Sequence, residues 1–107
     1  MKRLALAALL SLSLGAFAQD APDVAITIKD HKFSPDRIEV PAGKKVKLVV
    51  DNQDATPEEF ESHSMKVEKV IPGKSKATIF IGPLKAGEYK FVGEFNEKTA
   101  KGVIVAK

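Results

Sequence analysis

Apolar and polar residues alternate along most of this chain of 107 residues, and this two-residue period constrains the fold more than any other feature. A strand with one face on a core and the other in water alternates in this way, whereas an amphipathic helix repeats every 3.6 residues. Turn-forming Gly, Pro, Asn and Asp separate the alternating runs. The runs cover 24–28, 38–40, 46–50, 63–67, 77–81, 89–93 and 102–106.

These runs predict an all-β domain, a Greek-key β-sandwich of about seven to eight short strands. The segment NQDATPEEFE interrupts the alternation. Pro57 at a first helical position, followed by Glu58 and Glu59, predicts one helical turn there. In the run after it, His63 and Met65 would share a strand face with core residues, and His63 would therefore point inward.

The chain opens MKRLALAALLSLSLGAFAQDA, in which a basic start, an apolar run and an A-x-A cleavage site follow one another. This is the pattern of a secretory signal. The apolar run is too short to span ~30 Å of hydrocarbon as a helix. We therefore expect a cleaved signal peptide at 1–18, a single domain at 19–107 that does not itself span a membrane, and a periplasmic location.

Composition excludes several classes of function for that domain. The chain has 17 basic residues, and without Lys2 and Arg3 it has 15, against 14 acidic residues, so the domain is nearly neutral. No basic stripe suggests a nucleic-acid partner. The absence of Cys excludes a thiolate-bound metal and a Cys nucleophile. The sequence contains no P-loop, no G-x-G-x-x-G and no G-x-S-x-G motif.

Carboxylates are concentrated in one part of the chain. No basic residue occurs between Lys47 and Lys66, and that interval holds Asp51, Asp54, Glu58, Glu59 and Glu61. A cation would relieve the repulsion among these charges, and hard cations prefer oxygen ligands. The structural alternative is an acidic loop that is simply solvated.

His63 follows the acidic segment, and strand alternation would place it on the same face as Glu61 and Met65. An inward imidazole beside a carboxylate and a thioether could bind copper or iron. The alternative is a histidine that bonds a backbone carbonyl at the edge of the core. His31 lies in a predicted loop and Glu94 in the last loop, where each would ordinarily be a surface residue.

Longer stretches of the sequence resemble a known family. FSPDRIEVPAG, KVKLVVDN, SHSMKVEK and GPLKAGEYKFVGEF, with AKGVIV, resemble a cupredoxin. DATPEEFES, EKVIPGKSK, IGPLKAGEYKF and GEFNEKTAKG resemble, more narrowly, the exported cupredoxin-like proteins that accompany bacterial oxidase-dependent iron permeases. The resemblance covers nearly all of 24–107 and implies a cupredoxin-like sandwich.

The resemblance also implies where copper ligands would lie in a blue-copper protein. His63 matches the early His, and the Cys would fall near Gly93. The second His would fall at Asn96, and the axial Met around Ala100 or Lys101. A blue-copper site requires a thiolate. The chain is therefore not expected to be a blue-copper electron carrier.

What the resemblance implies instead is a periplasmic accessory role in iron uptake. The protein would bind copper or iron and assist oxidation of Fe(II) to Fe(III), as a ferroxidase component, for a membrane iron permease and a periplasmic iron-binding protein. The expected metal ligands converge at one end of the sandwich and are His63, Glu61, Glu59, Met65, His31 and Glu94.

Two other functions remain open from the sequence. A periplasmic copper-binding or copper-delivery protein would use His63, Met65 and His31 without the carboxylates. A metal-free docking module would need none of these residues, and Asn96 in place of a His favours it. No side chain of the chain can accept the electron from Fe(II), so oxidation would require a bound redox metal or a partner.

Overall fold

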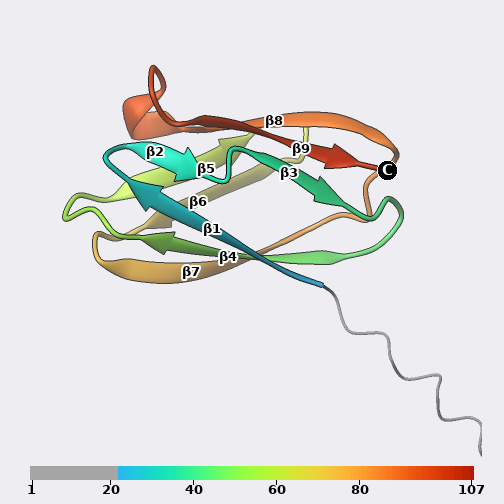
Figure 1. The fold of residues 1–107 in the computed structure, drawn as a ribbon, viewed down its shortest axis with the longest axis horizontal. Helices are drawn as coiled ribbons and strands as arrows, with labels where there is room; N and C mark the ends of the chain where they lie inside the picture. Colours follow the sequence, from blue (N-terminus) through green and yellow to red (C-terminus); the bar gives the residue numbers. More distant parts are fainter. Residues whose placement is uncertain (1–21) are drawn as a thin grey trace, which may run out of the picture.

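The computed structural model describes residues 22–107, which form two packed β-sheets with the shape of a flattened sandwich (Figure 1). The first sheet has the order β2 (Lys32–Ser34), β1 (Asp23–Lys29), β4 (Val46–Asn52) and β7 (Ser75–Ile81). The second has the order β3 (Arg37–Val40), β9 (Lys101–Ala106), β8 (Gly87–Gly93), β5 (Glu58–Ser62) and β6 (Val67–Ile71). The predicted all-β sandwich is confirmed.

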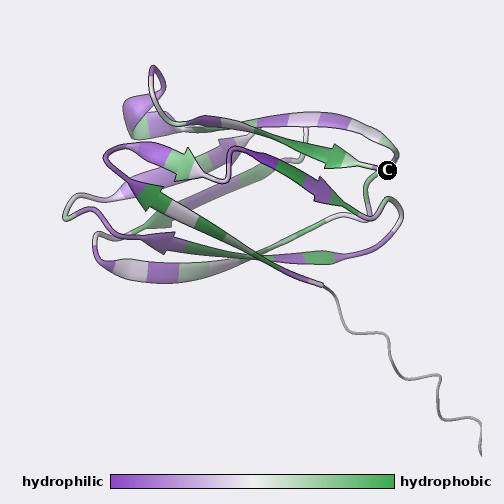
Figure 2. Ribbon diagram, viewed as in Figure 1, coloured by the Kyte–Doolittle hydropathy of each residue, from purple (hydrophilic) through white to green (hydrophobic). Residues whose placement is uncertain are grey.

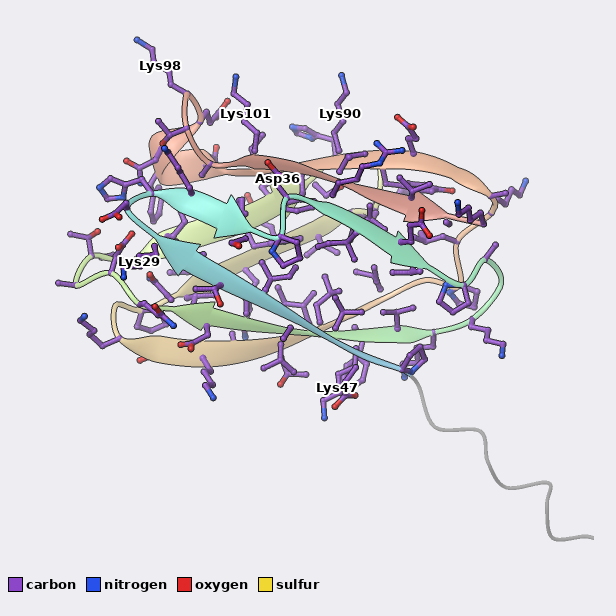
Figure 3. The ribbon with its side chains drawn as sticks, in the orientation of Figure 1. Lys29, Asp36, Lys47, Lys90, Lys98 and Lys101 are labelled. Atoms are coloured by element: carbon purple, nitrogen blue, oxygen red, sulfur yellow. The ribbon has the colours of Figure 1, made fainter. Side chains whose placement is uncertain are left out.

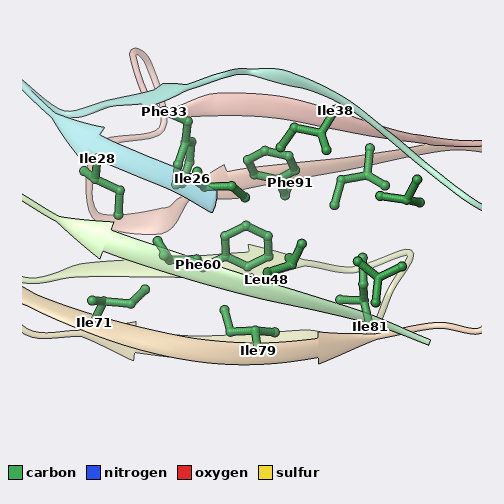
Figure 4. Packing of buried hydrophobic residues seen from close by; sticks show 14 of the residues in the cluster. Ile26, Ile28, Phe33, Ile38, Leu48, Phe60, Ile71, Ile79, Ile81 and Phe91 are labelled. Atoms are coloured by element: carbon green, nitrogen blue, oxygen red, sulfur yellow. The ribbon is translucent and has the colours of Figure 1, made fainter. Parts of the chain in front are cut away.

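The core lies between the sheets because alternate residues of each strand face inward. Along β4, Val46, Leu48 and Val50 are buried while the residues between them are partly exposed. Figure 2 shows the resulting change between hydrophobic and hydrophilic residues along the strands. Phe60 and Phe91 stack at the centre of the core, with their ring centroids 4.8 Å apart (Figure 4).

Each sheet combines antiparallel pairs with one parallel pair. β1 runs parallel to β4, with Ile26 opposite Val50, and β3 runs parallel to β9, with Ile38 opposite Ile104. Parallel neighbours cannot be joined by a tight hairpin, so the chain crosses between sheets to form them. One end of the sandwich therefore collects the β1–β2, β4–β5, β6–β7 and β8–β9 connections (Figure 1).

Two predicted elements around the acidic segment were wrong. Residues 58–62 form strand β5 rather than a helical turn, because Glu58, Phe60 and Ser62 alternate inward and each is buried. Residues 63–66 form the turn between β5 and β6 instead of continuing a strand, and Lys66 adopts a positive φ of 58°. The predicted loop DHKFSPD also contains a short strand, β2, which buries Phe33.

The predicted signal peptide, residues 1–18, lies outside the described residues. Within residues 22–107, no helix has the length and apolar character needed to cross a lipid bilayer. The single helical element described there that bears on the site is the 3-10 turn η2 (Glu94–Asn96), which follows β8.

Candidate metal centre

Four glutamates gather on the outer surface of the five-stranded sheet. Glu59 and Glu61 point outward from β5, because their neighbours in the strand point into the core. Glu68 of β6 lies opposite Glu61 in the strand register, and Glu94 begins η2 directly after β8. One carboxylate oxygen from each of Glu59, Glu68 and Glu94 lies within 4.8 Å of the others. We refer to Glu59, Glu61, Glu68 and Glu94 as the acidic face.

The close approach of these carboxyl groups alters their acidity. A hydrogen bond with the Glu94 carboxyl, followed by loss of hydration and by repulsion from Glu94, raises the pKa of Glu59 to about 7. Loss of hydration and the charge of Glu94 raise the pKa of Glu61 above its ordinary value, and His63 opposes this change. Among residues 22–107, no Lys or Arg lies within salt-bridge distance of Glu59, Glu68 or Glu94. Within the described residues, His63 beside Glu61 is therefore the basic group nearest to the acidic face in the ion-pair geometry.

His63 lies beside the acidic face but does not point into the protein, so the predicted inward orientation was wrong. Its side chain is 95% exposed, and its Nε2 lies 3.8 Å from Oε2 of Glu61. Met65 does not share a face with it, because Met65 packs against the hydrophobic core. The Met65 backbone N–H donates to the Oγ of Ser62, which fixes the turn that separates the two side chains.

His31 lies near a different carboxylate, that of Asp54 in the β4–β5 loop. The Asp54 carboxylate accepts hydrogen bonds from the backbone N–H groups of Asp30, at 2.8 Å, and His31, at 2.9 Å. His31 Nδ1 also lies 3.5 Å from Asp54 Oδ2. These contacts hold the β1–β2 turn, where both Asp30 and His31 have positive φ. The structure thus pairs His31 with Asp54 rather than with the acidic face.

We expect Asp54→Asn to lower the free energy of unfolding by about 1–2 kcal/mol at pH 7. The hydrogen bond from the His31 backbone is the largest cause that lowers the pKa of Asp54, and hydrogen bonds to a charged acceptor contribute about 1.5–3 kcal/mol. An asparagine keeps one oxygen acceptor but turns an NH₂ group toward the second backbone N–H. Urea unfolding of both proteins at pH 7 and pH 3 measures the effect.

The loss of stability in Asp54→Asn should depend on pH in a definite direction. A carboxyl group whose pKa is lowered by folding stabilises the protein above its unfolded pKa, near 4, and this contribution is lost as the pH falls through the folded value. The difference between wild type and Asp54→Asn should therefore narrow at pH 3. Asp36→Asn, at an exposed aspartate (Figure 3), is the matched control. An equal effect of the two substitutions would contradict the role of Asp54.

The positions where the resemblance would place blue-copper ligands are filled by a different arrangement. The buried Glu58 carboxylate accepts from Asn96 Nδ2 at 2.8 Å and from the Phe95 backbone N–H at 2.9 Å. A Cβ placed on Gly93 would lie 2.6 Å from Cδ of Glu58 and 2.7 Å from Cβ of Ala100. We refer to Glu58, Gly93, Asn96 and Ala100 as the closed pole. It has no thiolate and no room for one, so these residues do not fit a blue-copper ion.

Glu58 at the start of β5, rather than His63 in the turn after β5, meets the last loop. His63 lies five residues further along the chain, about 17 Å away for an extended strand. Sequence reasoning missed Glu58 because the segment was predicted as a helical turn. It missed Glu68 because the 63–66 turn was predicted as strand, so the pairing of Glu61 with Glu68 could not be seen. Phe60 is the one apolar residue of EEFES, so apolar/polar alternation could not have identified β5 or the inward Glu58.

Comparison with known proteins agrees with the two-sheet fold. The model of the family described as "Cupredoxin-like domain" matches residues 2–106. An uncharacterized protein of Rickettsia prowazekii (strain Madrid E), RP394, is 46% identical over 83 residues, which is 78% of this chain and 66% of that protein. The match thus leaves about a third of the length of that relative uncovered.

Solved structures show the same fold at low sequence identity. A copper-binding protein studied by NMR in its apo form superposes with a TM-score of 0.71 at 18% identity, over 82% of this chain and 90% of that chain. The metal-binding domain of the Streptococcus pneumoniae D39 Cu(I)-exporting P-type ATPase CopA, determined with Cu(I), gives 0.68 at 15% identity, over 79% and 84% of the two chains. These likenesses establish the shared sandwich architecture.

Proposed function

Because the chain belongs to the cupredoxin-like domain family, we propose that it is a metal-binding domain that holds copper or iron on its acidic face rather than at the closed pole. One observation carries this proposal. Oxygens of Glu59, Glu68 and Glu94, from three neighbouring segments of the sheet, converge to within 4.8 Å of one another. Carboxylates so close repel one another, and a shared cation would offset that repulsion.

The composition of the acidic face favours Fe or Cu(II) over Cu(I). Its ligand atoms are oxygens, and His63 is the nearest nitrogen ligand, beside Glu61. Cu(I) prefers thiolate and thioether ligands, whereas carboxylates suit harder ions. Met65, the thioether of the copper-delivery alternative, packs against the core. The oxygen-rich set therefore supports the iron-related function more than copper delivery.

We further propose that the domain is exported and serves iron uptake, together with a membrane iron permease and a periplasmic iron-binding protein. The sequence resemblance supports this role, since its EEFES and GEF motifs supply Glu59, Glu61 and Glu94 of the acidic face. One-electron chemistry would come from the bound metal, because no side chain here accepts an electron from Fe(II). The carboxylates of the chain would bind and orient the ion.

Metal titration of the purified protein tests the proposal. We expect one main site for Fe(II), measured by calorimetry without oxygen, and for Cu(II). Glu94→Gln should weaken binding at least tenfold, or about 1.4 kcal/mol, because it removes one of the converging carboxylates. Affinity should be higher at pH 8 than at pH 6, because the pKa of Glu59 is about 7 and a proton competes with the metal at the lower pH.

Glu39→Gln is the matched control for this titration. It removes the same charge from β3, which is separated from β5 by two strands of the same sheet. Equal affinities of the two variants would exclude the acidic face as the site. The double substitution Glu59→Gln and Glu61→Gln should weaken Fe(II) binding more than Cu(II) binding. His63→Ala should weaken Cu(II) binding more than Fe(II) binding. Equal losses for both ions would favour the copper-binding alternative.

A further inference from the structure

Glu58 is a buried carboxylate that accepts hydrogen bonds from two neighbouring segments, β5 and the η2 turn. Its side chain is almost inaccessible to solvent, at 2% exposure. Oε1 accepts from the backbone N–H groups of Glu59 and Phe95, each at 2.9 Å, and Oε2 accepts from Nδ2 of Asn96 at 2.8 Å. A buried carboxylate is costly unless it is hydrogen-bonded, so these three bonds constrain the segments that donate them.

The segments held by Glu58 carry two members of the acidic face. Glu59 follows Glu58 in β5 and points to the opposite side of the sheet. Glu94 lies between Gly93, which is opposite Phe60 in the strand register, and Phe95, which donates to Glu58. The backbone on both sides of Glu94 is therefore fixed to β5, on one side by sheet pairing and on the other by Glu58.

Apart from the hydrogen bond between the Glu94 and Glu59 carboxyl groups, the backbone bonds of the last loop do not fix Glu94 to β5. These backbone bonds close the loop on itself, since the N–H groups of Thr99 and Ala100 donate to the carbonyl of Asn96. Gly93 N–H also donates to the carbonyl of Ala100 within the same loop. Without the Glu58 bonds, the 94–96 turn could move as a closed unit about Gly93.

We propose that Glu58 is a positioning residue for the acidic face, which holds the 94–96 turn so that Glu94 lies next to Glu59 and Glu68. This inference rests on the proposed function and assigns a purpose to the closed pole. The positions that would bind copper in a blue-copper protein serve here to place a carboxylate on the outside of the sheet. Glu58 does not itself bind the ion, because its oxygens face inward and accept three hydrogen bonds.

A reciprocal exchange tests this inference. In Glu58→Gln, one carboxylate oxygen becomes an NH₂ group, which faces a donor in either amide orientation. Adding Asn96→Asp restores the pattern, because the NH₂ group introduced at position 58 can then donate to the carboxylate introduced at position 96, while the amide oxygen accepts from the Phe95 and Glu59 backbone. We expect Glu58→Gln to weaken Fe(II) and Cu(II) binding five- to tenfold, and the exchanged pair to recover most of that loss. Glu97→Gln, in the same loop and exposed, should leave affinity within twofold.

A double-mutant cycle separates positioning from general loss of structure. If Glu58 acts through Glu94, then Glu58→Gln should cost nothing further in a protein that already carries Glu94→Gln. A loss of the same size in both backgrounds would overturn the proposal. So would an unchanged affinity in Glu58→Gln when amide exchange shows that the Phe95 N–H has lost its protection.

The metal-free protein provides a readout that does not depend on the proposed function. NMR cross-relaxation between the side-chain methylenes of Glu59 and Glu94 should be present in wild type, lost in Glu58→Gln and restored in the exchanged pair. If wild type binds neither ion, the proposed function fails, and this measurement still decides whether Glu58 places Glu94. Cross-relaxation that persists in Glu58→Gln would show that the turn keeps its place without Glu58.

Discussion

Phe60→Ala should lower the free energy of unfolding by about 3–5 kcal/mol, the usual cost of removing a buried phenyl ring. Phe60 is fully buried, stacks on Phe91 and meets the edge of Phe33, with centroids 4.8 Å and 5.9 Å apart (Figure 4). A domain of this size has about 4–13 kcal/mol of stability in total. The substitution therefore removes a large part of it, and the urea midpoint should fall by about 2–4 M.

Phe80→Ala is the control for this measurement. Phe80 points outward from β7, is 52% exposed, and has the Nζ of Lys45 at 4.7 Å from its ring centroid. An exposed cation–π contact contributes about 0.5–1 kcal/mol, so this substitution should cost no more than that. Similar losses for the two phenylalanines would show that the 33–60–91 aromatic cluster is not the centre of the core.

Gly93→Cys should lower stability by about 3 kcal/mol, at the upper end of the range for overpacking a core. The backbone φ of Gly93 is −91°, so the strain comes from contact rather than from conformation. The added Cβ would lie within 3 Å of both Glu58 and Ala100. The thiol should not create a blue-copper spectrum, because Asn96 stands where the second His would fall and its Nδ2 donates to the buried Glu58 carboxylate.

Two further variants interpret the Gly93→Cys result. Ala100→Gly removes one of the two close contacts and should restore part of the stability in the Gly93→Cys background. Lys98→Cys introduces a thiol in the same loop at a side chain that projects into solvent (Figure 3), and should change stability by less than about 0.5 kcal/mol. A blue-copper absorption band in Gly93→Cys alone would contradict the description of the closed pole.

Sequence alternation predicted β1, β3, β4, β7, β8 and β9, because burial on one side of a sheet imposes that period. It placed another strand at 63–67, whereas β6 spans Val67–Ile71. It failed for β5, whose inward residues are Glu58, Phe60 and Ser62. Only one of these three is apolar. The inward position of Glu58 depends on donors from residues 95 and 96, far along the chain. No local pattern reveals such a partner.

The structure brings together part of the expected ligand set. Glu59, Glu61 and Glu94 gather on the outer face of a sheet, whereas the sequence placed them with the other expected ligands at one end of the sandwich. Glu68 was missed because the strand register depends on where the 63–66 turn begins. Strand alternation grouped Met65 with the site and the resemblance added His31, but Met65 packs against the core and His31 lies beside Asp54. The metal that the acidic face binds stays a prediction.

The pairing of β5 with its two neighbours is uneven. β5 and β6 share five residue pairs, whereas β5 and β8 share two, Phe60 with Gly93 and Glu61 with Val92. The β5–β6 hairpin is thus attached to the remainder of its sheet by a narrow seam. Glu59 and Glu68 belong to the hairpin, and Glu94 follows β8 on the other side of this seam. An ion bound by all three would therefore connect the hairpin to the rest of the sheet. Metal binding would then oppose separation of the hairpin from the sheet, and the metal-free domain would open there more easily than the metal-bound domain.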